Sequence, residues 1–179
     1  MFNHISETLP PSSGIEPLRV LMPIYDGFNT FDFNGPVEVL CQANRMSTEP
    51  HFKITVAAEE AITKSIENIR IDRDISLEDA IVRVKDFDVL LLAGGTIALI
   101  RSLIEEWKQK KIGCGTRLMT LLDNFMSDPS KLVLTVCTAA LFLGSLGRLD
   151  NRVATTHWVA LTILEEICCQ GRCTTHQQC

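Results

Sequence analysis

The sequence predicts an α/β fold in which a mostly parallel sheet is covered by helices on both faces. Strand-like runs alternate with helix-like runs along most of the chain, which is the pattern of a parallel sheet with crossover helices. The chain has 179 residues, of which 46% are apolar, so it can form one domain with a substantial core. Ligand sites in such sheets lie at the carboxyl ends of the strands, so the residues that follow each strand are the candidates for function.

The predicted strands are short apolar runs, several of them rich in β-branched residues. In chain order they are Leu18–Ile24, His51–Ala58, Phe87–Leu92, Lys131–Val136 and Arg152–Thr156, with a small extended excursion at Ile69–Ile75. The runs at 87–92 and 131–136 are apolar over most of their length, which predicts buried strands.

The predicted helices are recognised by the signals at their ends. Asn34-Gly35 precedes Pro36, whose fixed φ suits a first turn, so we expect a helix over Pro36–Ala43. Ser76 and Asp79 resemble a capping box that opens a short helix. Gly147 is suited to close a buried helix. Further helices are expected over Thr96–Lys110, Thr116–Met126, Thr138–Gly147 and His157–Ile167.

Composition and charge exclude several classes of protein. Net charge is −5 and no basic face is predicted, so we expect no nucleic-acid partner. The longest uncharged apolar run, Val89–Ile100, is too short to span a membrane, and residues 1–19 do not resemble a signal peptide. Seven cysteines without a secretory signal favour reduced thiols in a cytoplasmic protein. We expect a flexible lead-in over residues 1–17, a folded domain over 18–167 and an atypical cysteine-rich tail over 168–179.

Cys137 is the first candidate for function, because it lies where the run "KLVLTV" ends and a helical run begins. The free N–H groups at a helix start favour a thiolate, which would make Cys137 a nucleophile. The alternative is a small, inert core thiol, which is what most buried cysteines are. Thr138 follows, and its N–H and hydroxyl are suited to donate to a thiolate or a developing charge, or only to cap the helix.

Two more groups follow predicted strands and are expected at the same edge of the sheet. Gly94-Gly95 could expose backbone N–H groups as an oxyanion site, or form only a turn. Asp32 lies between two phenylalanines in "FDFNGP". Its carboxyl could transfer protons near Cys137, or act only as a helix N-terminal acid.

The other cysteines and histidines are assigned weaker roles. We expect His157 to cap or pack, Trp158 to be a core residue, and Cys41 to lie on the core face of a helix. The spacing of the tail cysteines and histidine fits neither paired-cysteine zinc template, so no metal site is predicted. These tail residues are Cys168, Cys169, Cys173, His176 and Cys179.

Three motifs in this order, "FDFNGPVEVL", "LLAGGT" and "VCTAALFLGSLGRLDNRVATTHW", resemble the ThiJ/PfpI family of the class I glutamine amidotransferase-like superfamily. The resemblance covers about residues 18–167 and is closest to isonitrile hydratases and the ligand-binding halves of AraC-type regulators. It implies a flavodoxin-like three-layer sandwich with the nucleophile at Cys137, its neighbouring hydroxyl at Thr138 and the acidic partner at Asp32. Gly94 and Gly95 match the glycine-rich turn. Thr138 after the cysteine and aspartate as the acid favour the hydratase-like branch over the protease branch.

The chain also departs from the family pattern, because its last residues do not resemble the further strand and helices of family members, so we expect a C-terminally truncated domain. Three functions therefore remain open. The first is a lyase that hydrates isonitriles or similar small electrophiles through a covalent thioimidate on Cys137, without metal or cofactor. The second is a non-enzymatic small-molecule sensor, and the third an inactive remnant. The resemblance implies a small-molecule substrate and a homodimer, and the lack of a membrane-spanning run predicts no membrane partner.

Overall fold

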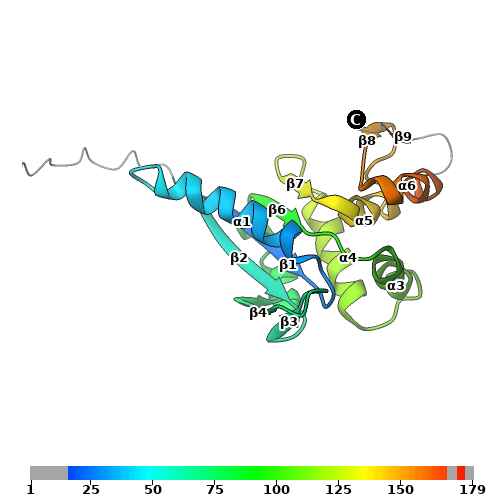
Figure 1. Cartoon of the computed structure of the whole chain (residues 1–179), viewed down its shortest axis with the longest axis horizontal. Coiled ribbons are helices and arrows are strands. Elements are labelled where there is room, and N and C mark those ends of the chain that lie inside the picture. Colours follow the sequence, from blue (N-terminus) through cyan, green and yellow to red (C-terminus); the bar gives the residue numbers. More distant parts are fainter. Residues whose placement is uncertain (1–15, 169–172, 176–179) are drawn as a thin grey trace, which may run out of the picture.

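The computed structural model describes residues 16–168 and 173–175, and its centre is a five-stranded parallel sheet (Figure 1). The strand order is β5-β2-β1-β6-β7, so the sheet has the α/β, flavodoxin-like architecture that the sequence predicts. The strands are β1 (Leu18–Ile24), β2 (Phe52–Ala58), β5 (Ile75–Ser76), β6 (Val89–Leu92) and β7 (Leu132–Thr135). The segment between β2 and β5 forms an antiparallel hairpin of β3 (Ile62–Lys64) and β4 (Arg70–Asp72).

Helices cover both faces of the sheet because the crossovers run in opposite directions. The chain moves from β1 to β2 toward one edge through α1 (Thr30–Arg45). It then returns across β1 to β6 and β7 through α2 (Leu77–Val82), α3 (Ile97–Lys108) and α4 (Cys114–Phe125). Right-handed crossovers that advance in opposite directions lie on opposite faces, which puts α1 on one face and α2 to α4 on the other. The contacts of α4 with both α2 and α3 agree with this layer.

Helix α1 begins earlier than the sequence predicts, at Thr30 rather than Pro36. The reason is Asn29, whose side chain accepts hydrogen bonds from the N–H groups of Phe31 and Asp32 and so caps the helix. Pro36 lies inside α1 instead of in its first turn. The earlier start matters for function, because it places Asp32 in the first turn of a helix. By contrast, the capping role of Ser76 is confirmed, since its hydroxyl accepts the Asp79 N–H.

Strand β7 is the edge of the sheet within the described residues and is not the fully buried strand that its apolar sequence predicts. The side chains of Leu132 and Leu134 lie on the same face of β7 and are 53% and 43% exposed. The predicted strand at 152–156 also differs, since β8 (Arg152–Ala154) pairs in parallel with β9 (Cys173–Thr175) in a separate two-stranded sheet. An apolar run alone does not distinguish an edge strand from a central one, because both contain the same β-formers.

The remaining helices follow β7 and complete the core. A 3₁₀ turn, η2 (Cys137–Ala139), leads into α5 (Ala140–Ser145), and η3 (Trp158–Ala160) leads into α6 (Leu161–Ile167). Tyr25 and Phe142 pack edge to face with ring centroids 5.6 Å apart, which joins the end of β1 to α5. Cys168, counted with the tail by the sequence analysis, is buried in this core. The rest of the predicted tail side chains and residues 1–15 lie outside the described residues.

None of the described helices has the length and apolarity that crossing a bilayer requires.

Candidate functional site

Three segments meet at the carboxyl ends of β1, β6 and β7, where the sequence analysis expects a site. Cys137 follows β7, Gly94 and Gly95 follow β6, and Asp32 lies in α1 after β1. Cys137 has φ +59°, a left-handed conformation that is uncommon for a residue with a side chain. This sharp turn between strand and 3₁₀ helix is the geometry of a nucleophile elbow, which directs a side chain out of the sheet edge. Figure 1 shows β6 and β7 side by side, leading to this edge.

The Thr138 side chain fastens the β6 loop to this turn. Its Oγ1 accepts the Gly95 N–H at 3.0 Å and donates to the Gly95 carbonyl oxygen at 2.7 Å. In the resting site the Thr138 hydroxyl proton and the Gly95 N–H are therefore both engaged within this pair, and neither is available to another acceptor. The Thr138 backbone N–H remains beside the Cys137 thiol, where its hydrogen bond favours the thiolate.

Gly94 is a position where a side chain cannot fit. A Cβ atom there would lie 2.7 Å from Thr138 Oγ1 and 2.9 Å from both Asp32 Oδ2 and the Thr138 backbone N. The Gly94 carbonyl oxygen also accepts the Asn29 N–H at 2.8 Å, which joins the β6 loop to the cap of α1. The absence of a side chain at Gly94 therefore lets the acid and the threonine approach one another.

The Asp32 carboxyl is buried although it has an unused oxygen. The residue is only 8% exposed, and Oδ2 is buried with no hydrogen-bond partner among the described residues. Burial raises the pKa of the Asp32 carboxyl above its ordinary value. Hydrogen bonding with the Cys137 thiol and the Gly94 N–H opposes that rise. An unsatisfied buried carboxyl oxygen is costly, so this oxygen has hydrogen-bonding capacity that the resting site does not use.

The pKa of the Cys137 thiol is raised, which corrects the expectation of a stabilised thiolate. Burial is the main cause, and the negative charge of Asp32 adds to it. The N–H and hydroxyl of Thr138 lower the pKa but do not outweigh these two effects. The helix-start N–H groups are therefore present as predicted. Burial and the charge of Asp32, which lies in α1, outweigh their lowering of the Cys137 pKa. In the resting site the thiol is neutral at physiological pH.

A cavity of about 280 Å³ opens beside Cys137 and is wide enough for a small organic molecule. Its lining combines the elbow with three apolar side chains and the "TTHW" segment: Asn29, Ile66, Gly95, Thr96, Ile97, Cys137, Thr138, His157 and Val159. The Thr156 hydroxyl donates to the Cys137 carbonyl oxygen at 2.9 Å and so holds this segment against the elbow.

His157 is the lining residue that the sequence analysis undervalued. Its predicted capping role is confirmed, because Nδ1 accepts the Val159 N–H at 3.4 Å. In the neutral ring this leaves the proton on Nε2. A positive charge on this ring lowers the pKa of the Asp32 carboxyl. The available signal for His157 in the sequence was the Thr156-His157 pair that follows Cys137, because the Thr156 hydroxyl bonds to the Cys137 carbonyl oxygen. The adjacent Trp158 is not a core residue as predicted, being 72% exposed.

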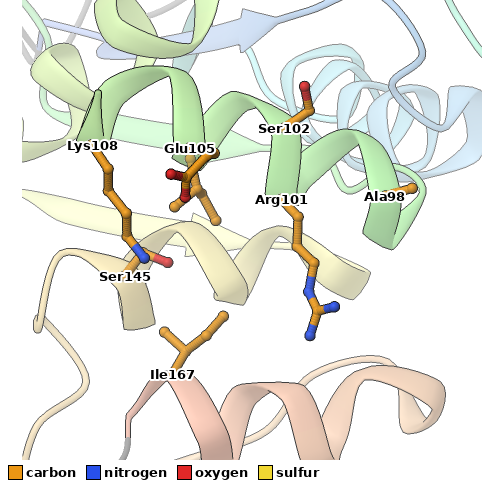
Figure 2. Close-up of a pocket in the computed structure, with 8 residues that line it drawn as sticks. Ala98, Arg101, Ser102, Glu105, Lys108, Ser145 and Ile167 are labelled. Atoms are coloured by element: carbon orange, nitrogen blue, oxygen red, sulfur yellow. The ribbon is translucent and has the colours of Figure 1, made fainter. Parts of the chain in front are cut away.

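A larger groove of about 440 Å³ lies elsewhere, between α3, α5 and α6. Figure 2 shows Arg101 and Lys108 pointing from α3 toward the other two helices, with Glu105 between them. Cys137 and Thr138 do not line this groove. Its charges have both signs, and Arg101 already faces Glu166 at 3.7 Å. Its size therefore does not make it the candidate reaction site.

The described residues contain no group of three or more histidine, cysteine or acidic side chains placed to bind a metal ion. The chemistry available beside Cys137 is that of a thiol, a buried carboxyl with a raised pKa, an imidazole and backbone N–H groups. These groups can perform nucleophilic attack and proton transfer.

Comparison with known proteins supports the architecture. An uncharacterized protein in the cpoL 5′ region of Streptomyces lividans is 29% identical over 152 residues, which cover 85% of this chain and 96% of that protein. An AraC family transcriptional regulator from Pseudomonas putida matches with a TM-score of 0.70 at 20% identity, over 90% of this chain and 77% of the other. Drosophila melanogaster DJ-1beta matches with a TM-score of 0.69 at 20% identity, over 92% and 76%.

The putative protease I from Bacteroides thetaiotaomicron has the same fold, with a TM-score of 0.70 at 13% identity over 90% of this chain and 83% of the other. At these identities the solved structures establish the fold alone. The family is established by the sequence, because the DJ-1/PfpI family model matches residues 18–170. This chain is a member of the DJ-1/PfpI family.

Proposed function

We propose that the chain is a cysteine-dependent hydratase that adds water to isonitriles or similar small electrophiles. The observation that carries the proposal is the buried, unpartnered Oδ2 of Asp32, in a carboxyl whose pKa and that of the Cys137 thiol each depend on the other group. This arrangement has a nucleophile, an acid that can exchange a proton with it, and unused hydrogen-bonding capacity on the acid. Hydration requires these three parts, because one water must be held and its protons moved.

The cavity supports a neutral substrate. Among the described residues that line it, Ile66, Ile97 and Val159 provide apolar surface, and neither lysine nor arginine is present. A substrate carboxylate or phosphate would therefore find no lysine or arginine partner in the lining. An isonitrile is small, uncharged and electrophilic at its terminal carbon, so it suits both the cavity and the thiol.

The proposed reaction begins with transfer of the thiol proton to the Asp32 carboxylate as Cys137 Sγ bonds to the isonitrile carbon. Asp32 returns the proton to that carbon, which gives a covalent thioimidate with a carbon–nitrogen double bond. Water held by the Asp32 carboxylate then adds to the same carbon, and the carboxylate takes one water proton and delivers it to the nitrogen, which gives a tetrahedral intermediate. The carbon–sulfur bond breaks as the hydroxyl proton of this intermediate passes through the carboxylate to the sulfur, and an N-substituted formamide leaves. The sum is one isonitrile plus one water, with no oxidant or reductant.

A neutral thiol suits this sequence because the proton that it loses is needed at the substrate carbon. The Thr138 N–H beside the sulfur supports the developing negative charge during attack and departure. The Thr138 hydroxyl and the Gly95 N–H, which we expected to help, are bonded to each other. They could donate to an intermediate only by exchanging partners.

The test is formamide production from cyclohexyl isonitrile by the purified chain in ¹⁸O-labelled water. We expect one labelled oxygen in the product and loss of about a thousandfold or more of the rate in Cys137→Ala. Cys41→Ala is the matched control, because Cys41 lies half-buried on α1 away from the cavity lining and should leave the rate unchanged. Equal rates in Cys137→Ala and the wild type would refute the proposal.

The raised pKa of Cys137 also favours a second candidate, a small-molecule sensor domain with an unreactive thiol. The same cavity would then bind a neutral amide or nitrile without converting it. Isothermal titration with N-cyclohexylformamide separates the candidates: binding combined with no isonitrile turnover supports the sensor. A non-cooperative thermal melt of the purified chain would instead support the inactive remnant that the sequence analysis left open.

A further inference from the structure

The hairpin of β3 and β4 reaches from the far side of the sheet to the cavity beside Cys137. The Gly27 N–H donates to the Lys64 carbonyl oxygen at 2.7 Å, and the Ile66 N–H donates to the Phe28 carbonyl oxygen at 2.9 Å. The Lys64 N–H donates in turn to Asp26 Oδ1 at 2.9 Å. These bonds join one strand of the hairpin, and the start of its turn, to the loop that leads into α1.

The tip of the hairpin has a second attachment, at the start of α1. The Glu67 carboxylate accepts both the backbone N–H of Thr30, at 3.0 Å, and the Thr30 hydroxyl. These hydrogen bonds lower the pKa of Glu67, so the carboxylate stays charged and the tie is kept at neutral pH. Asn68 completes the turn with φ +65°. Ile66 carries the last bond of the first attachment and precedes Glu67, so it is held in a defined place.

Ile66 lines the cavity, yet it does not belong to the hydrophobic core. It is 50% exposed, so half of its apolar surface faces water in the resting protein. Ile97 and Val159 provide apolar surface from other elements of the same lining. A hydrocarbon group in the cavity would cover this surface of Ile66, which gains free energy in proportion to the apolar area removed from water.

We infer that Ile66 is a specificity-determining residue, the apolar wall that contacts the substituent of the electrophile and favours branched or cyclic hydrocarbon groups over methyl. The inference rests on the proposed function for its natural substrate class. It also applies to other neutral electrophiles, because Ile66 and Cys137 line the same cavity. The expected preference is modest, since one or a few methylene groups in an apolar pocket change selectivity by about tenfold or somewhat more.

The first experiment compares kcat/KM for methyl, isopropyl and cyclohexyl isonitrile in the wild type and in Ile66→Ala. We expect a loss of about tenfold with the cyclohexyl compound, mainly in KM, and less than twofold with the methyl compound. Ile69→Ala is the matched control, because Ile69 is 48% exposed in the same turn but does not line the cavity. Ile66→Val should give an intermediate loss. A ratio between substrates that is unchanged or increased in Ile66→Ala overturns the inference.

A second experiment separates this inference from the proposed hydration. N-cyclohexylmaleimide and N-methylmaleimide alkylate thiols without any hydration step. The ratio of their rate constants at Cys137 therefore measures how the cavity receives the N-substituent, independently of hydration. We expect Ile66→Ala to lower the ratio of cyclohexyl to methyl rates several-fold and Ile69→Ala to leave it unchanged. If the wild type hydrates no isonitrile and this ratio still falls, the proposed function fails and the inference about Ile66 stands. Equal ratios in the wild type and Ile66→Ala overturn the inference.

Discussion

The Thr138 hydroxyl and the Gly95 backbone hold each other by two hydrogen bonds, one to the Gly95 N–H at 3.0 Å and one to its carbonyl oxygen at 2.7 Å. Thr138 comes from the turn after β7, and Gly95 from the loop after β6. The pair therefore sets the distance between two loops that both border the cavity. These two bonds continue the hydrogen bonding between β6 and β7 beyond the end of their backbone pairing, with a side chain on one partner.

Replacing Thr138 by valine should remove both bonds at nearly constant volume. The Gly95 N–H and carbonyl groups would lose their partner in a partly buried position, and we expect a loss of about 1–3 kcal/mol in the free energy of unfolding. Thr138→Ser keeps the hydroxyl and should retain most of that stability. Urea unfolding of the three proteins measures the difference. Valine and serine variants of equal stability would mean that the two bonds contribute little.

Gly94→Ala should disturb the site more than an alanine elsewhere, because the new Cβ would lie 2.7 Å from Thr138 Oγ1 and 2.9 Å from Asp32 Oδ2. We expect about 1–3 kcal/mol of destabilisation and a loss of formamide production, since the acid and the threonine must separate. Gly35→Ala is the control: it lies in α1 with no atom within 4 Å of the new Cβ. There alanine should stabilise by about 0.5–1 kcal/mol. Thermal melts compare the two, and a neutral Gly94→Ala would show that the site is looser than described.

The convergence of these residues could be predicted from the sequence because it depends on topology alone. Cys137 and Gly94 each follow an apolar strand, and parallel strands end at the same edge of the sheet. Asp32 was placed near them on the same ground, although the start of α1 depended on the cap by Asn29. These three expectations needed no distances.

The electrostatics and the cavity wall could not be predicted in the same way. The direction of the Cys137 pKa depends on the balance between helix-start N–H groups and the Asp32 charge, which are far apart in sequence and close in space. Ile66 lies in a polar, turn-rich stretch that has no functional pattern. Its place at the cavity results from backbone bonds to the loop at 26–30, which have no signature in residue type.

Asp32→Asn should lower the pKa of Cys137, because it removes a negative charge that opposes the thiolate. The pH at which alkylation by iodoacetamide reaches half its maximal rate should therefore fall, while formamide production is lost with the proton carrier. Cys114 is an internal control, because burial raises the pKa of its thiol to about 12, and it should stay unlabelled up to pH 9. Labelling is followed site by site by mass spectrometry. A midpoint that rises or does not move in Asp32→Asn would contradict the charge argument.

The same acid should make stability depend on pH in a defined direction. The folded pKa of Asp32 is raised above its unfolded value of about 3.9, so its favourable contribution is complete below that pH and is lost as pH rises through the folded pKa. Asp32→Asn should therefore be more stable than the wild type at pH 7.5, and the difference should shrink toward pH 3.5. Urea midpoints across this range measure it.

Asp79 provides the opposite case. The Ser76 hydroxyl and N–H lower the pKa of its carboxyl, so its contribution is present above about pH 3.9 and is lost as pH falls through the folded pKa. Asp79→Asn should be less stable than the wild type at pH 7.5, and the difference should shrink as pH falls below about 3.9. If both asparagine variants shifted stability in the same direction at neutral pH, burial would not be the dominant effect at Asp32.

The left-handed backbone at Cys137 should cost stability that a glycine recovers. With φ at +59°, Cys137 adopts a conformation that disfavours any residue with a Cβ by about 1 kcal/mol. Cys137→Gly should therefore be more stable than Cys137→Ala by about that amount, although neither variant has the nucleophile. Asn68 at φ +65° is a comparison site outside the elbow, where Asn68→Gly against Asn68→Ala should show the same order. If the two Cys137 variants unfolded at the same urea concentration, the elbow would have relaxed on loss of the thiol, and the strained turn would depend on the sulfur's contacts with Asp32 and Thr138.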